Sequence, residues 1–173
     1  HLNNQNGLPS NSVFNIHQDN KGFVWLATSE GLIRYDGFEY KTYKSPNQTS
    51  VAGSDIKEDK FGRIWYENFD GFIYFIENDT LKSLKQNELV GFISYGISDK
   101  NLFSIQKKGI DVFDLKNLKF IKTIPISIEE AEHATTSGFD FYFIADDILY
   151  KIDESFKISS TDFFENKKLK VKY

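Results

Sequence analysis

Short hydrophobic runs, separated by Gly, Asp and Asn, follow one another along the chain. Such runs predict β-strands, because an amphipathic helix needs a longer stretch with apolar residues three or four positions apart. The first group predicts strands at Val13–Gln18, Phe23–Thr28, Leu32–Tyr35 and Phe38–Tyr43. The second of these is apolar throughout, as expected for a buried strand, and the fourth alternates apolar and polar side chains, as expected at an edge. The pattern therefore predicts an antiparallel sheet of four strands.

A set of landmark residues returns at an offset of 40 positions. Asp19, Gly22, Trp25, Gly31 and Tyr35 correspond to Asp59, Gly62, Trp65, Gly71 and Phe75. A period of about 40–45 residues with four short strands in each unit is typical of propeller blades. The expected fold class is therefore all-β, a β-propeller built of four-stranded antiparallel blades.

The same plan continues along the chain in weaker form. Blades are expected at residues 8–44, 45–85, 90–125 and 130–158, within one partial propeller domain of residues 1–173. Residues 159–173 are expected to form a tail or the start of a further blade. The later strands are expected at Val51–Lys57, Arg63–Glu67, Phe72–Ile76, Thr80–Leu84, Phe92–Ser98, Leu102–Gln106, Gly109–Phe113, Leu118–Ile124, Ala134–Ser137, Phe141–Ile144, Ile148–Ile152 and Phe156–Ile158.

A ring of four blades is physically possible, but blades of this kind more often close as larger rings. Seven blades of this size need roughly 280 residues, so the four visible blades are interpreted as part of a larger, seven-bladed ring. An open arc of blades exposes an apolar face, which predicts self-association as a dimer or a cap on that face.

The landmark side chains have a structural and a functional interpretation. Asp19 and Asp59 begin four-residue turns, so we expect them to bind backbone amides of the turn rather than a metal ion. Trp25 and Trp65 lie inside apolar strands, so we expect them to pack in the core rather than to stack on a sugar ring.

The first blade also carries a resemblance to a known family. Residues 7–37 read GLPSNSVFNIHQDNKGFVWLATSEGLIRYDG and resemble the two-component regulator propeller repeat. The resemblance is good again over Asp59–Gly71, where Glu67 and Asn68 depart from the small residue and Thr of the pattern, and it is generic beyond residue 90.

The resemblance implies the periplasmic sensor region of an inner-membrane hybrid two-component system from a glycan-degrading gut bacterium. Such a protein has two seven-bladed propellers and an immunoglobulin-like domain, followed by a transmembrane helix, a histidine kinase and response-regulator modules. The resemblance further implies an oligosaccharide ligand and regulation of genes for polysaccharide use.

Composition removes several other classes of protein. The net charge of −4 argues against a nucleic-acid partner. The chain has no Cys, which removes disulfides, thiol catalysis and thiolate metal sites. No apolar stretch reaches the roughly 20 residues that cross a bilayer, so membrane contact is expected only through other segments. A start at His1, without Met or a signal peptide, indicates a processed or excised piece.

The remaining polar residues form no recognisable site. His17 has no partner at ligand spacing and is interpreted as an ordinary strand residue. Glu129, Glu130, Glu132 and His133 form the densest acidic cluster, which we interpret as a solvated connection between blades. No motif for phosphate binding or nucleophilic catalysis is present, so no catalytic residue, metal site or cofactor is expected, and the ligand-binding residues are unknown from the sequence.

Three functions follow from these observations. The leading hypothesis is a non-catalytic sensor domain that detects an oligosaccharide. The first alternative is a structural or dimerisation propeller without a ligand site of its own. The second is a propeller lyase or hydrolase whose site is assembled from separated loops.

Overall fold

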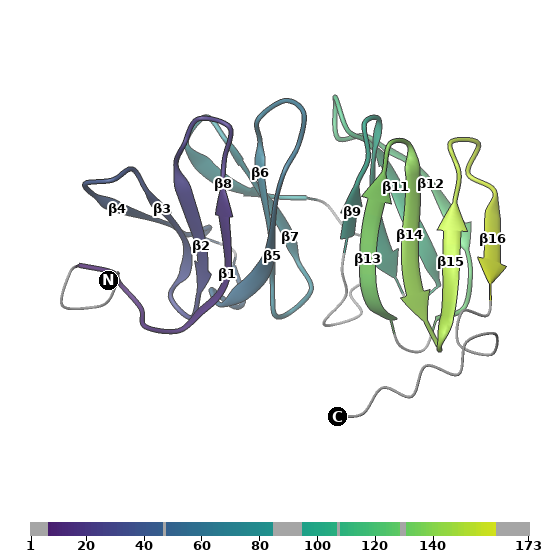
Figure 1. The fold of residues 1–173 in the computed structure, drawn as a ribbon, viewed down its shortest axis with the longest axis horizontal. Coiled ribbons are helices and arrows are strands. Elements are labelled where there is room, and N and C mark those ends of the chain that lie inside the picture. The colour runs from purple at the N-terminus through teal and green to yellow at the C-terminus, as the bar shows by residue number, and fades with distance from the viewer. Residues whose placement is uncertain (1–6, 47, 85–94, 107, 129–130, 162–173) are drawn as a thin grey trace. The chain divides into compact units, whose positions relative to one another are not determined.

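The structure is a computed structural model that describes residues 7–46, 48–84, 95–106, 108–128 and 131–161. The chain divides into two compact units, His1–Phe92 and Ile93–Tyr173. Each unit holds two antiparallel sheets of four strands (Figure 1). The described elements are all β-strands, which confirms the predicted all-β class with four-stranded blades.

The strands of the first unit pair in the order of the sequence, so each connection within a sheet is a hairpin. The first sheet consists of β1 (Val13–Gln18), β2 (Val24–Thr28), β3 (Gly31–Tyr35) and β4 (Tyr40–Tyr43). The second sheet consists of β5 (Gly53–Glu58), β6 (Ile64–Asn68), β7 (Ile73–Glu77) and β8 (Thr80–Ser83).

One apolar core joins these two sheets. The first sheet contributes Trp25, Ala27, Leu32 and Tyr43, and the second contributes Ile56, Ile64, Tyr66, Tyr74 and Leu81. Burying a large apolar side chain contributes about 1.5–3 kcal/mol relative to leaving it in water. The apolar faces of these strands thus form a packed interface between the first and second blades.

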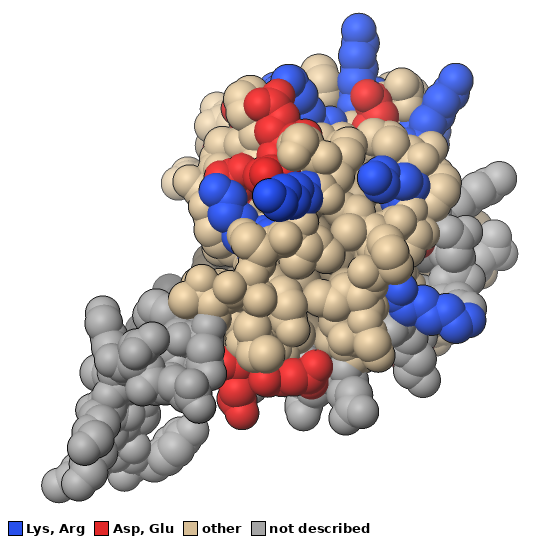
Figure 2. Space-filling view, turned by 90° about the vertical axis from the view of Figure 1, so that its right-hand side faces the viewer, with Lys and Arg blue, Asp and Glu red and all other residues tan. Residues whose placement is uncertain are grey.

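The second unit repeats this organisation with different core residues. Its sheets consist of β9 (Tyr95–Ile97), β10 (Asn101–Gln106), β11 (Gly109–Asp114) and β12 (Phe120–Pro125), and of β13 (Ala131–Ser137), β14 (Asp140–Ala145), β15 (Ile148–Ile152) and β16 (Ile158–Thr161). On the side of this unit where β15 and β16 lie, uncharged residues occupy the middle, and charged side chains surround them (Figure 2).

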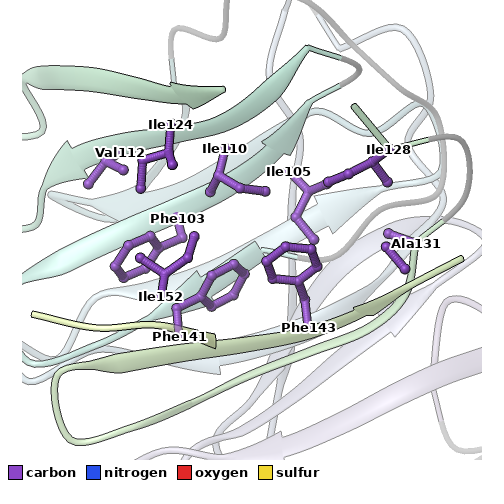
Figure 3. Packing of buried hydrophobic residues seen from close by; sticks show 11 residues of the cluster. Phe103, Ile105, Ile110, Val112, Ile124, Ile128, Ala131, Phe141, Phe143 and Ile152 are labelled. Atoms are coloured by element: carbon purple, nitrogen blue, oxygen red, sulfur yellow. The ribbon is translucent and has the colours of Figure 1, made fainter. Parts of the chain in front are cut away.

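Aromatic stacking connects the two sheets of the second unit (Figure 3). The rings of Phe103 on β10 and Phe141 on β14 are parallel, with centroids 4.8 Å apart. A Cβ added at Gly96 on β9 would lie 2.4 Å from ring atoms of Phe141, so only glycine fits there. This close approach of backbone to ring brings the two sheets together.

The structure corrects the end of the fourth blade. The sequence places its last strand at Phe156–Ile158, but β16 is Ile158–Thr161 and pairs with β15. Phe156 lies in the preceding turn, with a φ of 64°. Residues 159–161 therefore belong to the sheet, not to a tail or further blade, and residues 162–173 lie outside the described residues. The larger ring stays a prediction.

Candidate functional site

The first landmark aspartate connects a turn to the core. Asp19 Oδ1 accepts hydrogen bonds from the backbone N–H groups of Lys21 (3.0 Å) and Phe23 (2.9 Å). Gly22 occupies the position in this turn that needs a positive φ, at 89°. Asp19 Oδ2 accepts a third hydrogen bond from the indole Nε1 of Trp25 at 2.7 Å. One carboxylate thus shapes the turn and satisfies the buried tryptophan.

The second landmark aspartate makes the same bonds. Asp59 Oδ1 accepts from the N–H groups of Phe61 (2.8 Å) and Arg63 (3.1 Å), and Asp59 Oδ2 accepts from Trp65 Nε1 at 2.8 Å. The guanidinium of Arg63 adds a further bond to Oδ2 through Nε, at 2.7 Å. The sequence analysis expected the turn but missed the indole. The sequence signal for this hydrogen bond is the six-residue spacing between Asp and Trp, which both blades share.

These bonds decide what the landmark residues do. Asp19 and Asp59 are buried with both carboxylate oxygens in use. Trp25 and Trp65 are buried as well, with 3% and 0% of their surface exposed. Both aspartates already use their carboxylate oxygens within the protein, so other residues must supply the groups that bind a ligand.

A groove of about 420 Å³ lies in the first unit, between the first and second sheets. We call it the inter-sheet groove, and its lining residues are Asp19, Lys21, Phe23, Trp25, Arg34, Gly62, Arg63, Ile64, Ile76, Glu77, Asn78 and Asp79. The walls are formed by the first turn and β3 on one side, and by the start of β6 and the β7–β8 turn on the other.

Arg34 extends into this groove from β3. It is the cross-strand partner of Trp25, and its guanidinium lies 4.7 Å from the centroid of the Phe23 ring. One guanidinium nitrogen is 3.7 Å from a carboxylate oxygen of Asp79, which is an ion pair but not a hydrogen bond. Within the described residues, the Arg34 side chain donates no hydrogen bond.

Asp79 faces Arg34 from the second sheet. It lies in the two-residue β7–β8 turn, where Asn78 and Asp79 have φ of 50° and 58°. Its carboxylate accepts hydrogen bonds from Lys41 Nζ and, at 2.6 Å, from the Tyr43 hydroxyl. The bond from Lys41 is the main cause of a lowered pKa of Asp79. Burial and the bond to Asp79 raise the pKa of Tyr43.

This arrangement places polar and apolar groups together where they can contact a polar ligand. The groove offers guanidinium and ammonium donors, carboxylate acceptors, a side-chain amide and apolar side chains. No cluster of His, Cys, Asp and Glu suited to a metal ion occurs among the described residues. The second unit has a smaller hollow of about 130 Å³, lined by largely uncharged residues of β13, β14 and β15.

Two other sequence candidates lie away from the groove. His17 Nε2 is 3.7 Å from Glu58 Oε2, which also accepts the backbone N–H of Asn20 at 3.0 Å. Glu58 belongs to β5, so these contacts join the first two sheets. Glu129 and Glu130 lie outside the described residues, and His133 is exposed on β13, so the acidic cluster stays an untested interpretation.

The sequence analysis did not identify the groove residues. Arg34 follows the apolar residues Leu32 and Ile33 and stands where the second blade has Tyr74. This exchange of an aromatic residue for a cation at one repeat position was the available signal. No such signal marks Asp79 in the sequence, because turn residues are usually polar for conformational reasons.

Comparison with known proteins supports the interpretation of the first blade as a propeller repeat. A family model described as two component regulator propeller matches residues 7–30. Histidine kinase P4 of Formosa agariphila is 37% identical over 46 residues, which are 27% of this chain and 3% of that protein. The chain thus spans only a small part of the relative that it matches.

Solved structures share the fold. The extracellular domain of a hybrid two-component system from B. thetaiotaomicron is 21% identical, with a TM-score of 0.69 over 93% of this chain and 26% of that chain. A virginiamycin B lyase from Staphylococcus aureus is 20% identical, with a TM-score of 0.71 over 89% of this chain and 57% of that chain.

At these identities the structural similarity establishes the β-propeller fold and no function, since one fold hosts many functions. The family model is specific for the residues that carry the landmarks Asp19, Gly22 and Trp25. The resemblance to two-component regulator propeller repeats that the sequence indicated is therefore confirmed over residues 7–30, which match that family model.

Proposed function

We propose that this chain is the ligand-recognition part of an extracytoplasmic sensor in a hybrid two-component system, and that its ligand is an oligosaccharide. The regulator propeller repeat and the extracellular propellers of B. thetaiotaomicron systems support a sensor-type role. The inter-sheet groove is the single structural observation that carries the ligand assignment. We place the groove's role in binding, without turnover of the ligand.

The groove has the chemistry of a saccharide site. A sugar presents many hydroxyl groups, each both a donor and an acceptor, on a ring with apolar faces. Arg34 and Asn78 offer donors, Asp79 and Glu77 offer acceptors, and Phe23 offers an apolar surface. Sites of this kind combine apolar walls with a few placed polar groups.

The wider role follows the same proposal. The sensor lies in the periplasm, acts through a histidine kinase and regulates genes for polysaccharide use. Among the described residues, no helix is long and apolar enough to cross a membrane. We expect other segments of the protein to contact the membrane, and we expect no residue of this chain to contact nucleic acid.

Calorimetric titration of the 173-residue chain with neutral and acidic oligosaccharides tests the proposal. We expect saturable binding of one class and no change of the ligand, checked by chromatography after incubation. Absence of binding across the panel contradicts the ligand assignment. Cleavage of any sugar contradicts the non-catalytic role and favours the lyase or hydrolase alternative.

A dimerisation propeller is the second candidate, and one surface favours it. Val13, Phe14 and Ile16 on β1 are exposed by 42%, 48% and 64%, an unusual apolar content for one strand. Sedimentation of Ile16→Lys separates the candidates, with Phe38→Lys as a matched control because Phe38 is 92% exposed in the β3–β4 turn. A dimer that only Ile16→Lys dissociates supports this candidate, and a monomeric parent chain contradicts it.

A further inference from the structure

The charged groups of the inter-sheet groove are unequally satisfied. Each carboxylate of the groove has a hydrogen-bond donor. Asp19 binds backbone amides and an indole, Glu77 accepts from Lys82 Nζ at 2.6 Å, and Asp79 accepts from Lys41 and Tyr43. The acidic side of the groove therefore has its partners within the protein.

The cationic side has unused donors. Arg34 has an ion pair with Asp79 and no hydrogen bond, and the Lys21 ammonium has neither among the described residues. The Arg34 side chain is 27% exposed and lines the groove, so its guanidinium donors are accessible to a ligand there. Its planar fork matches a carboxylate or sulfate in a bidentate manner.

Asp79 shows what kind of group fits beside Arg34. Its carboxylate reaches the guanidinium at 3.7 Å, while Lys41 and Tyr43 hold it from the other side. An acidic group from a ligand would approach Arg34 more closely and find Lys21 on the same wall of the groove. Asp79 would keep both of its hydrogen bonds and repel the incoming charge only in part.

The geometry points to an acidic saccharide as the ligand, with its carboxylate or sulfate bound by Arg34 and Lys21 in the inter-sheet groove. This inference rests on the proposed sensor function and adds the chemical class of the ligand. The groove residues all belong to the first unit, so the inference can be tested with this chain.

Matched pairs of saccharides test the inference by calorimetric titration of the full chain. Trigalacturonate is compared with its neutral trimethyl ester, and a sulfated chondroitin disaccharide with its desulfated form, which keeps its uronate carboxylate. The first pair therefore tests the carboxylate and the second pair tests the sulfate. We expect the member with the recognised acidic group to bind at least 10-fold more tightly than its partner without that group, which is about 1.4 kcal/mol, because hydrogen bonds to charged groups are the stronger ones. The pair that shows this preference distinguishes carboxylate from sulfate.

Three variants locate the acidic group. Arg34→Gln and Lys21→Gln are expected to abolish or reduce the preference for the acidic member. Asp79→Asn is expected to increase the ratio of the affinity for the acidic member to that for its partner, because it removes a competing negative charge. Lys60→Gln is the control, since Lys60 is exposed in the equivalent turn of the second sheet and does not line the groove. Lys21 is exposed in a turn, so its variant stays informative if Arg34→Gln unfolds.

The outcomes separate this inference from the proposed function. Equal binding of the two members in both pairs overturns the acidic class and leaves the sensor proposal standing. An acidic preference that survives in both Arg34→Gln and Lys21→Gln overturns the groove as its site. Failure of all four saccharides and of the wider neutral panel overturns the oligosaccharide proposal itself.

Discussion

The two units reach the same four-stranded sheets through different chemistry. In the first unit, a buried aspartate in each sheet links a turn to a tryptophan indole. In the second unit, neither Trp nor an equivalent buried aspartate is present in the described strands, and the rings of Phe103 and Phe141 stack instead. The Asp–Trp motif is therefore one way to build the core of such a sheet. The second unit forms four-stranded sheets without this motif.

Removing the aromatic stack should have the largest effect. Phe103→Ala deletes a ring with 1% exposed surface from the second unit, and such a change costs about 3–5 kcal/mol. Amide hydrogen exchange of β10 and β14 is expected to show the loss. Both Trp residues lie in the first unit, so fluorescence melting reports that unit separately. A loss below about 1 kcal/mol in β10 and β14 would contradict the importance of the stack.

Removing the aspartate of the first unit should come next. Asp19→Ala leaves the Trp25 indole and two turn amides without their acceptor, which is expected to cost about 2–3 kcal/mol in chemical unfolding. Asp153→Ala in the second unit is the control, because Asp153 accepts the turn amides of Ser155 and Lys157 and the Ser155 hydroxyl but no indole. Equal losses in the two variants would show that the indole bond adds nothing.

A buried carboxyl of the first unit should make stability depend on pH. Burial, with a smaller contribution from Asp55, raises the pKa of Glu67 from 4.5 to about 8. The folded state thus holds a proton that the unfolded state has lost between about pH 4.5 and 8. Stability should fall as pH rises through this window, by up to about 1.4 kcal/mol per pH unit.

Glu67→Gln should remove this slope, as urea unfolding at a series of pH values would show. The second unit provides the comparison, because the hydrogen bond from Ser155 lowers the pKa of its Asp153, which shifts in the direction opposite to Glu67. A pH profile that stays the same after Glu67→Gln would assign the slope to other groups.

The smallest effect concerns two turns with the same backbone geometry. Asp146 and Asp147 connect β14 and β15 with φ of 50° and 63°, as required for a hairpin turn that favours glycine at its second position. Asp147→Gly should raise stability by about 0.5–1 kcal/mol in thermal unfolding. Asp79→Gly in the β7–β8 turn, which has the same backbone geometry, should give no gain, because it removes the bonds to Lys41 and Tyr43. A gain in both variants would argue against a connecting role for Asp79.

The sequence by itself determined the strands, the hairpin turns and the four sheets. Alternation of apolar and polar residues defines which face of a strand is buried, and Asp and Gly define turns through contacts a few residues apart. Such local signals predicted β1 to β8 closely. They failed at Phe156, because a bulky residue at positive φ is unfavourable alone and is stabilised here by packing against the core of the second unit.

Only the tertiary structure decided where the candidate site lies. Arg34 and Asp79 are 45 positions apart (79 − 34) and belong to different sheets, so no local pattern relates them. They meet because the apolar faces of the first two sheets pack together and bring β3 beside the β7–β8 turn. The Asp–Trp hydrogen bonds also became evident only from the tertiary structure. The sequence contains the six-residue spacing, but it does not show that a buried indole requires an acceptor there.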